Sequence, residues 1–160
     1  MLYNIPARSG RYVSTRALLT CAEHDRVSGV KQAVGALDEE TLNLLANTNE
    51  KFSIMAGDDY LAAPITLLGG KGAVSASAHL ATNLWVEMVD SALASDSKRA
   101  LEIHAKLLPL VKACFAEPNP TVFKGVLASM GEITSDFVRL PLLPASNQSV
   151  DSLLDIVKSL

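Results

Sequence analysis

Lys31 is the residue of this sequence best suited to covalent chemistry, because it follows the short run from Val27 to Val30 and ends a predicted strand. Apolar surroundings favour the neutral form of a lysine, and a neutral amine can attack a ketone to form a Schiff base. Gly29 leaves room beside the lysine side chain. The simpler interpretation is that Lys31 reaches into solvent where a strand ends. These residues alone favour the simpler interpretation, so the rest of the chain must decide.

Other polar residues lie at the ends of predicted strands. Tyr3 and Lys31 could converge there, and a tyrosine phenol near a lysine amine is a plausible proton shuttle for imine formation. The planar guanidinium of Arg8 suits a substrate carboxylate. The alternatives are a strand aromatic for Tyr3 and a surface ion pair for Arg8. Asp58 and Asp59 are interpreted as a helix N-cap and a first-turn acid, in preference to metal ligands.

The elements that must position these residues alternate between strand and helix. Strands are expected over residues 1–5, 27–31, 52–56 and 72–76, with helices over 14–23, 38–46 and 60–68. The strands start 20 to 26 residues apart and are short and apolar, which is typical of a parallel α/β sheet covered on both faces. Active sites of such folds lie at the carboxyl ends of the strands, where Gly57 and Val74 also lie.

After residue 80 the sequence predicts helices only. They are expected over 82–94, from Asp96 or Ser97 to about Cys114, and over 121–130, and a last helix is expected to be capped by Ser149. Helical spacing predicts that Leu42 and Leu45 are buried. In the helix over 82–94 it predicts burial of Trp85, Val86, Met88, Val89, Ala92 and Leu93. The domains are therefore expected to be residues 1–80, a sheet with its helices, and residues 81–160, which are helical.

Composition excludes several classes of protein. The 160 residues are 49% hydrophobic and 19% charged, with mean hydropathy +0.24, which is typical of a globular domain. A formal net charge of −3 and a pI near 5.6 argue against nucleic acid or an anionic membrane as partner. No signal peptide or membrane span is recognisable. Cys21 and Cys114 are expected to be buried thiols of a cytoplasmic protein, and no histidine has metal-ligand spacing.

Several motifs resemble the dihydrodipicolinate synthase/N-acetylneuraminate lyase family of class I aldolases. Residues 3–10 resemble its YN(I/V)PxRTG stretch, and Gly29-Val30-Lys31 resembles the strand of its Schiff-base lysine. Further likenesses are residues 53–59 to its SGDD strand, 69–78 to GGxGVISVTA, 117–124 to EPNPxxxK and 139–141 to RLP. The likeness covers essentially the whole chain but only the second half of the family's fold. It implies strands five to eight of a (β/α)8 TIM barrel, followed by a C-terminal α-helical extension.

The resemblance also implies roles for individual residues. Lys31 would form an imine with pyruvate without any separate cofactor, and Tyr3 would relay protons. Arg8 would hold the carboxylate of the second substrate, while Gly57 and the Val74 backbone would line the pyruvate pocket. The implied reaction condenses pyruvate with aspartate semialdehyde in lysine and diaminopimelate biosynthesis.

The choice within the family rests on a few residues. Arg8, the Gly57-Asp58-Asp59 run and the turn at Glu117 favour the synthase branch, whereas Gln32 leans towards the lyase branch. N-acetylneuraminate lyase and 2-keto-3-deoxy sugar acid aldolases are therefore alternatives.

The family's first four βα units have no counterpart in the sequence, including the loop that grips the pyruvate carboxylate. A different alternative is thus an inactive fragment or an assembly subunit. The expected partners are small-molecule substrates, together with further copies of the chain or a missing N-terminal half-barrel. Open strand edges would need such cover.

Overall fold

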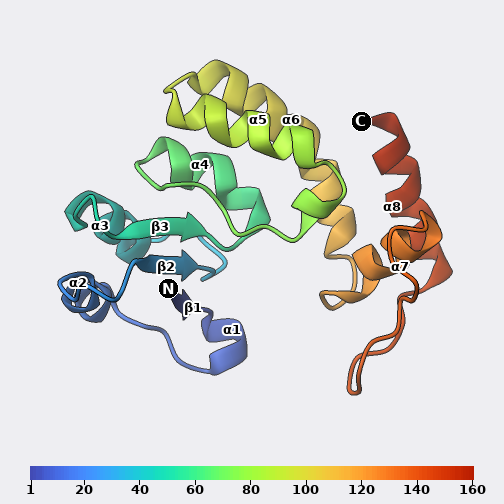
Figure 1. The fold of residues 1–160 in the computed structure, drawn as a ribbon, viewed down its shortest axis with the longest axis horizontal. Helices are drawn as coiled ribbons and strands as arrows, with labels where there is room; N and C mark the ends of the chain where they lie inside the picture. The colour runs from blue at the N-terminus through green and yellow to red at the C-terminus, as the bar shows by residue number, and fades with distance from the viewer. The chain divides into compact units, whose positions relative to one another are not determined.

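The computed structural model describes residues 1–160 and contains a parallel sheet with helices after each strand (Figure 1). The strands lie in the order β1 (Leu2–Asn4), β2 (Gly29–Gln32) and β3 (Ser53–Ala56). The first helices are α1 (Pro6–Ser9), α2 (Thr15–Ala22), α3 (Glu39–Asn47) and α4 (Ala62–Leu67), with 3-10 turns η1 (Asp59–Leu61) and η2 (Ser77–His79). The later helices are α5 (Thr82–Leu93), α6 (Ser97–Cys114), α7 (Thr121–Ser129) and α8 (Asn147–Ser159). The predicted α/β class is confirmed.

The chain groups into two compact units. Residues 1–75 and 87–101 form the unit that holds the sheet, and residues 76–86 and 102–160 form a helical unit. The expected domain boundary at residue 80 stays a prediction. None of the helices is both long and apolar enough to cross a membrane.

One face of the sheet is packed against helices and the other carries the candidate chemistry. Val30, Ile54 and Ala56 are almost completely buried. Figure 1 shows α4 running alongside β3, with which it is in contact. Because side chains alternate along a strand, Tyr3 and Lys31 project from the opposite face. The apolar packing of the first face therefore presents both residues on the second.

The predicted fourth strand, residues 72–76, is reduced to a single bridge between Ala56 and Ala73. The Ala56 amide donates to the Gly72 carbonyl at 2.9 Å, and the Val74 amide donates to the Ala56 carbonyl at 2.8 Å. Beyond it the chain turns into η2. In this chain the segment has β3 on one side only, and a strand pairs more extensively when both edges find partners.

A short helix, α1, begins at Pro6 directly after β1. Proline is favoured in a first helical turn because its missing N–H needs no partner there. Gly10 ends α1 in the left-handed region, with φ +67°, and its amide bonds to the Pro6 carbonyl. The consequence is that Arg8 lies on a helical turn directly after β1.

The buried residues of two helices differ in part from those predicted. In α3 the buried residues are Thr41 and Leu44, whereas Leu42 is 43% exposed and Leu45 is half-buried. Asp38 caps this helix by accepting from the Thr41 amide at 2.8 Å, and that start sets which side faces the core. In α5, Trp85, Met88 and Ala92 are buried as predicted, whereas Val86 and Leu93 are both more than half exposed, which contradicts their predicted burial.

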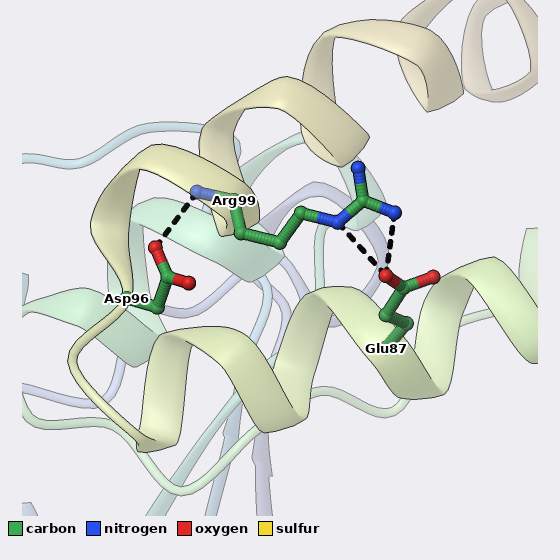
Figure 2. Close-up of polar contacts among 3 residues, drawn as sticks. All are labelled: Glu87, Asp96 and Arg99. Atoms are coloured by element: carbon green, nitrogen blue, oxygen red, sulfur yellow. Dashed lines mark hydrogen bonds and ion pairs between the residues drawn. The ribbon is translucent and has the colours of Figure 1, made fainter.

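The turn between α5 and α6 is fixed by polar contacts (Figure 2). The Asp96 carboxylate accepts from the Arg99 amide at 3.0 Å and so caps α6, as predicted for its start. The Arg99 side chain donates through Nε to the Glu87 carboxylate at 2.8 Å. Both contacts lie in the sheet-containing unit; the first caps α6, and the second joins its first turn to the middle of α5.

Ser146, and not Ser149, caps α8. Its hydroxyl accepts from the Ser149 amide at 3.3 Å and donates to the Glu117 carboxylate at 2.7 Å. The Ser146 amide also donates to that carboxylate, at 3.1 Å. Hydrogen bonds from Ser149 and Ser146 lower the pKa of Glu117 below its ordinary value. The prediction of Ser149 was wrong because the carboxylate that fixes the cap lies far away in the sequence.

Ser146→Ala is expected to lower the free energy of unfolding by about 1 kcal/mol, the usual cost of losing an N-cap. Urea denaturation followed by circular dichroism measures this loss. Ser149→Ala is the matched control, because it keeps the backbone amide that Ser146 caps, and it should cost less. An equal or larger loss from Ser149→Ala would contradict the assignment of the cap.

His104 is expected to make the stability depend on pH. Burial lowers the pKa of its imidazole below the ordinary value of 6.5. The unfolded chain therefore takes up the proton first as the pH falls, so stability is full above pH 6.5 and declines as the pH falls towards the lower folded pKa. Urea midpoints at pH 7.5 and 5.5, chosen to bracket about 6.5, should differ more for the wild-type chain than for His104→Gln. An unchanged difference in the variant would refute this.

Candidate active site

Tyr3 and Lys31 lie side by side on the open face of the sheet. They are register partners in the parallel pair of β1 and β2. The Lys31 Nζ atom lies over the Tyr3 ring, 4.5 Å from its centroid. Lys31 is half-buried and Tyr3 is 51% exposed. The convergence predicted from strand alternation is therefore present, and a cation over an aromatic face is attracted by the ring's quadrupole.

Gly57 makes the space through which the lysine side chain passes. Its amide donates to the Gln32 carbonyl at 2.7 Å, which ties the end of β3 to the end of β2. A Cβ atom at this position would lie 2.6 Å from the Ala33 Cβ, 2.9 Å from the Gln32 carbonyl oxygen and 3.0 Å from the Lys31 Cγ. The absence of a side chain at Gly57 is thus a requirement of the lysine's conformation.

Asp58 joins two of the loops at the carboxyl ends of the strands. Its side chain accepts from the Gly35 amide at 2.8 Å, and the Tyr60 hydroxyl donates to the Gly35 carbonyl at 2.8 Å. Asp58 occupies the N-cap position of η1 and Asp59 lies in its first turn, as predicted, but the Asp58 side chain makes no capping hydrogen bond there. Burial raises the pKa of Asp58, and the neighbouring charge of Asp59 adds to the rise, while Gly35 and Lys31 oppose it.

The remaining predicted site residues lie at the same ends of the strands. Arg8 is exposed on α1, five residues after Tyr3. Val74 is 43% exposed, and its amide is bound to the carbonyl of Ala56. The structure thus places Arg8 after β1 and Val74 beside β3. The parts assigned to them by the family resemblance stay predictions.

The sequence interpretation missed a buried polar network directly behind the lysine. Asn4 and Gln32 are buried amides whose side chains bond to each other at 3.0 Å, and Gln32 also bonds to Thr41. They follow Tyr3 and Lys31 by one residue, so alternation turns them to the helix-covered face. The sequence signal that could have revealed this network was a polar residue, Asn4, inside a strand predicted to be covered on both faces.

Chemically, the site offers an amine beside a phenol, with a carboxylate close by and a guanidinium on the following helical turn. No group of three or more histidine, cysteine, aspartate or glutamate side chains forms a metal-binding cluster. Such an arrangement suits the attack of an amine on a carbonyl compound with a nearby proton carrier.

The model of the dihydrodipicolinate synthetase family matches residues 1–160. The chain belongs to this family. Among curated relatives, 4-hydroxy-tetrahydrodipicolinate synthase 2 of Clostridium acetobutylicum is 39% identical over 153 residues, 96% of this chain and 53% of the relative. The synthase of Archaeoglobus fulgidus is 34% identical over the whole chain and 55% of its own length. The chain therefore spans about half the length of the curated relatives it matches.

Solved structures of the family reproduce the fold of this chain. A dihydrodipicolinate synthase from Acinetobacter baumannii, solved with pyruvate, is 32% identical and superposes with a TM-score of 0.91, covering 98% of this chain and 53% of that one. Another dihydrodipicolinate synthase is 36% identical, with a TM-score of 0.89 over 99% of this chain and 54% of that one. The family's fold thus accounts for nearly every residue of this chain.

Proposed function

We propose that this chain supplies the lysine-bearing half of a dihydrodipicolinate synthase-like lyase, which condenses pyruvate with aspartate semialdehyde. The position of the Lys31 Nζ atom over the Tyr3 ring carries the proposal, because it places a nucleophile beside a proton carrier on an open sheet face. Family membership and the synthase relatives support the choice of reaction. The pyruvate complex of the Acinetobacter baumannii synthase supports the choice of first substrate.

In this proposal the neutral Lys31 amine adds to the ketone carbon of pyruvate, and the resulting carbinolamine loses water to give the imine. Tyr3 carries protons to and from the oxygen that leaves. The backbone at Gly57 and Val74 lines the pyruvate pocket, and Arg8 binds the carboxylate of the semialdehyde. The imine itself activates pyruvate, so the chemistry requires no separate cofactor.

We propose further that the sheet is strands five to eight of a (β/α)8 barrel whose other half lies outside this sequence. The chain covers 53% of its relative from Clostridium acetobutylicum, which is the share expected of one half of such a fold. β1 is an edge strand, and the bridge at Ala73 marks the other edge. Open edges of a parallel sheet are normally covered. The partner is an N-terminal half-barrel, in an assembly that can include further copies of the chain.

The exposure of the site favours a second candidate function, that of an assembly subunit without activity of its own. Tyr3 is 51% exposed and Val74 is 43% exposed, although both would line an enclosed pocket in a working enzyme. In that case the lysine-bearing half reacts only after a partner closes the pocket. The two candidates make different predictions for the isolated chain.

Trapping with borohydride separates them. Pyruvate and sodium borohydride should convert Lys31 of the isolated, folded chain into a stable secondary amine, detected by mass spectrometry of its peptide. Lys31→Arg is the matched control, because it keeps the positive charge but cannot form the imine. Labelling confined to other lysines, or none on a folded chain, would reject independent activity. Labelling of Lys31 only after addition of an N-terminal half-barrel of a relative would support the assembly subunit.

A further inference from the structure

A chain of buried hydrogen bonds runs directly behind the pair formed by Tyr3 and Lys31. We call Asn4, Gln32 and Thr41 the amide network; they are 0%, 2% and 0% exposed. The Asn4 Nδ2 donates to the Gln32 Oε1 at 3.0 Å, and the Gln32 Nε2 donates to the Thr41 Oγ1 at 3.0 Å. The network therefore links β1, β2 and α3 through side chains alone.

Both ends of the amide network are anchored to backbone. Asn4 bonds twice to Val13, accepting from its amide at 3.0 Å and donating to its carbonyl at 3.1 Å. Thr41 is held by its own amide, which donates to the carboxylate of Asp38. Asn4 and Gln32 thus have fixed orientations, because each amide group has a partner on both sides.

The register of the sheet connects the amide network to the candidate site. Asn4 and Gln32 are register partners, and they follow the partners Tyr3 and Lys31 by one residue. A shift of register would break the hydrogen bond between the Asn4 and Gln32 side chains. It would leave buried polar groups unpaired, at a cost of about 1–3 kcal/mol for each group. The same shift would move the Tyr3 ring away from the lysine. One hydrogen bond therefore specifies the arrangement of both pairs.

Burial alone does not explain amides at these positions. Apolar side chains of similar volume fill such space without the cost of desolvating polar groups, and buried polar pairs are better explained by the arrangement that they specify. We propose that Asn4 and Gln32 are positioning residues that hold the Tyr3 ring against the Lys31 side chain. The claim that this positioning matters for catalysis rests on the proposed function, whereas the positioning itself does not.

Proton NMR of the full chain tests the positioning. The Tyr3 ring should shift the ε-methylene protons of Lys31 upfield of those of the other lysines, and Tyr3→Leu should abolish the shift and so assign it. Gln32→Leu should remove at least half of the shift while circular dichroism shows a folded chain. Thr66→Val is the matched control, because its buried hydroxyl bonds within α4 to the Ala62 carbonyl at 2.7 Å.

Thr41→Val keeps the size of the side chain and removes the acceptor for the Gln32 amide, together with the side-chain contacts of Thr41 to Asp38 and Tyr12, so it tests the proposal if Gln32→Leu does not fold. It should reduce the upfield shift partially. A full shift in whichever of these variants folds would overturn the proposal, as would an equal reduction in Thr66→Val.

The link to function has a separate readout. Where the wild-type chain forms the borohydride-trapped adduct, Gln32→Leu should slow it by about ten- to a hundredfold, as small displacements of reacting groups do. A wild-type chain without an adduct would reject independent activity and leave the NMR test intact. An adduct at the wild-type rate in a folded Gln32→Leu chain would reject the catalytic meaning of the amide network.

Discussion

Gly29→Ala is expected to push β2 and β3 apart and to destabilise the sheet-containing unit strongly. A Cβ atom at position 29 would lie 2.2 Å from the Ser53 carbonyl oxygen and 3.0 Å from its carbonyl carbon. Gly29 and Ser53 are register partners, so the clash lies within the sheet itself. Neither atom belongs to a flexible side chain, and only movement of a strand relieves the contact.

The expected loss is at least about 3 kcal/mol, the upper end of the usual cost of overpacking. That is a large part of the total stability of about 5–15 kcal/mol that is usual for a domain. Urea denaturation measures it, with Ser28→Ala as control, because Ser28 is exposed and its bond to the Ser53 amide comes from the backbone. A Gly29→Ala chain with the midpoint of Ser28→Ala would show that the strands do not approach so closely.

The arrangement of the candidate site could be predicted because it depends on local order. Parallel strands end on one side of a sheet, and alternation fixes which residues share a face. Those two rules were sufficient to place Tyr3 beside Lys31, with Gly57 at the end of the next strand. The strand boundaries themselves moved by up to two residues, since β2 begins at Gly29 and runs to Gln32.

Contacts between distant residues could not be predicted in the same way. Ser146 is held in place as the cap of α8 by its hydrogen bond to Glu117, which lies 29 residues away. The Asp58 carboxylate accepts from the Gly35 amide, 23 residues away, and does not bond to the amides of the helix that follows it. Short-range patterns favour capping by any serine or aspartate near a helix start, so they rank such residues equally. Only the folded chain decides which one has a second partner.

The predicted fourth strand shows that strand composition alone does not make a segment a strand. The sequence around Ala73 has the composition of a strand, and the structure pairs it with β3 at one bridge. Propensity for strands is largely a fit to neighbours on both sides. The helix-covered face of the same sheet has its neighbours, and there Val30, Ile54 and Ala56 are almost completely buried, as expected for apolar strands covered by helices.

Gly57→Ala is expected to displace Lys31 and to destabilise the chain by about 1–3 kcal/mol, because it forces a methyl group into packed surroundings. The nearest atom is the Cβ of Ala33, at 2.6 Å, and the Cγ of Lys31 lies at 3.0 Å. The lysine side chain can move aside, but the Ala33 methyl is fixed to the backbone at the end of β2. The proposed site should therefore lose both stability and the contact between Lys31 and Tyr3.

A second substitution makes this prediction sharper. Ala33→Gly in the Gly57→Ala chain removes the closest atom and should restore part of the free energy of unfolding, although the Gln32 carbonyl oxygen would still lie 2.9 Å from the new methyl. Urea denaturation gives the energies, and the upfield shift of the Lys31 ε-methylene protons reports the position of the lysine. Ala33→Gly alone corrects for the lost methyl and the added flexibility. The losses of unfolding free energy in Gly57→Ala and in Ala33→Gly can be added and compared with the loss in the double variant. If the double variant lost as much as this sum, the contact between Gly57 and Ala33 would not set the path of the lysine.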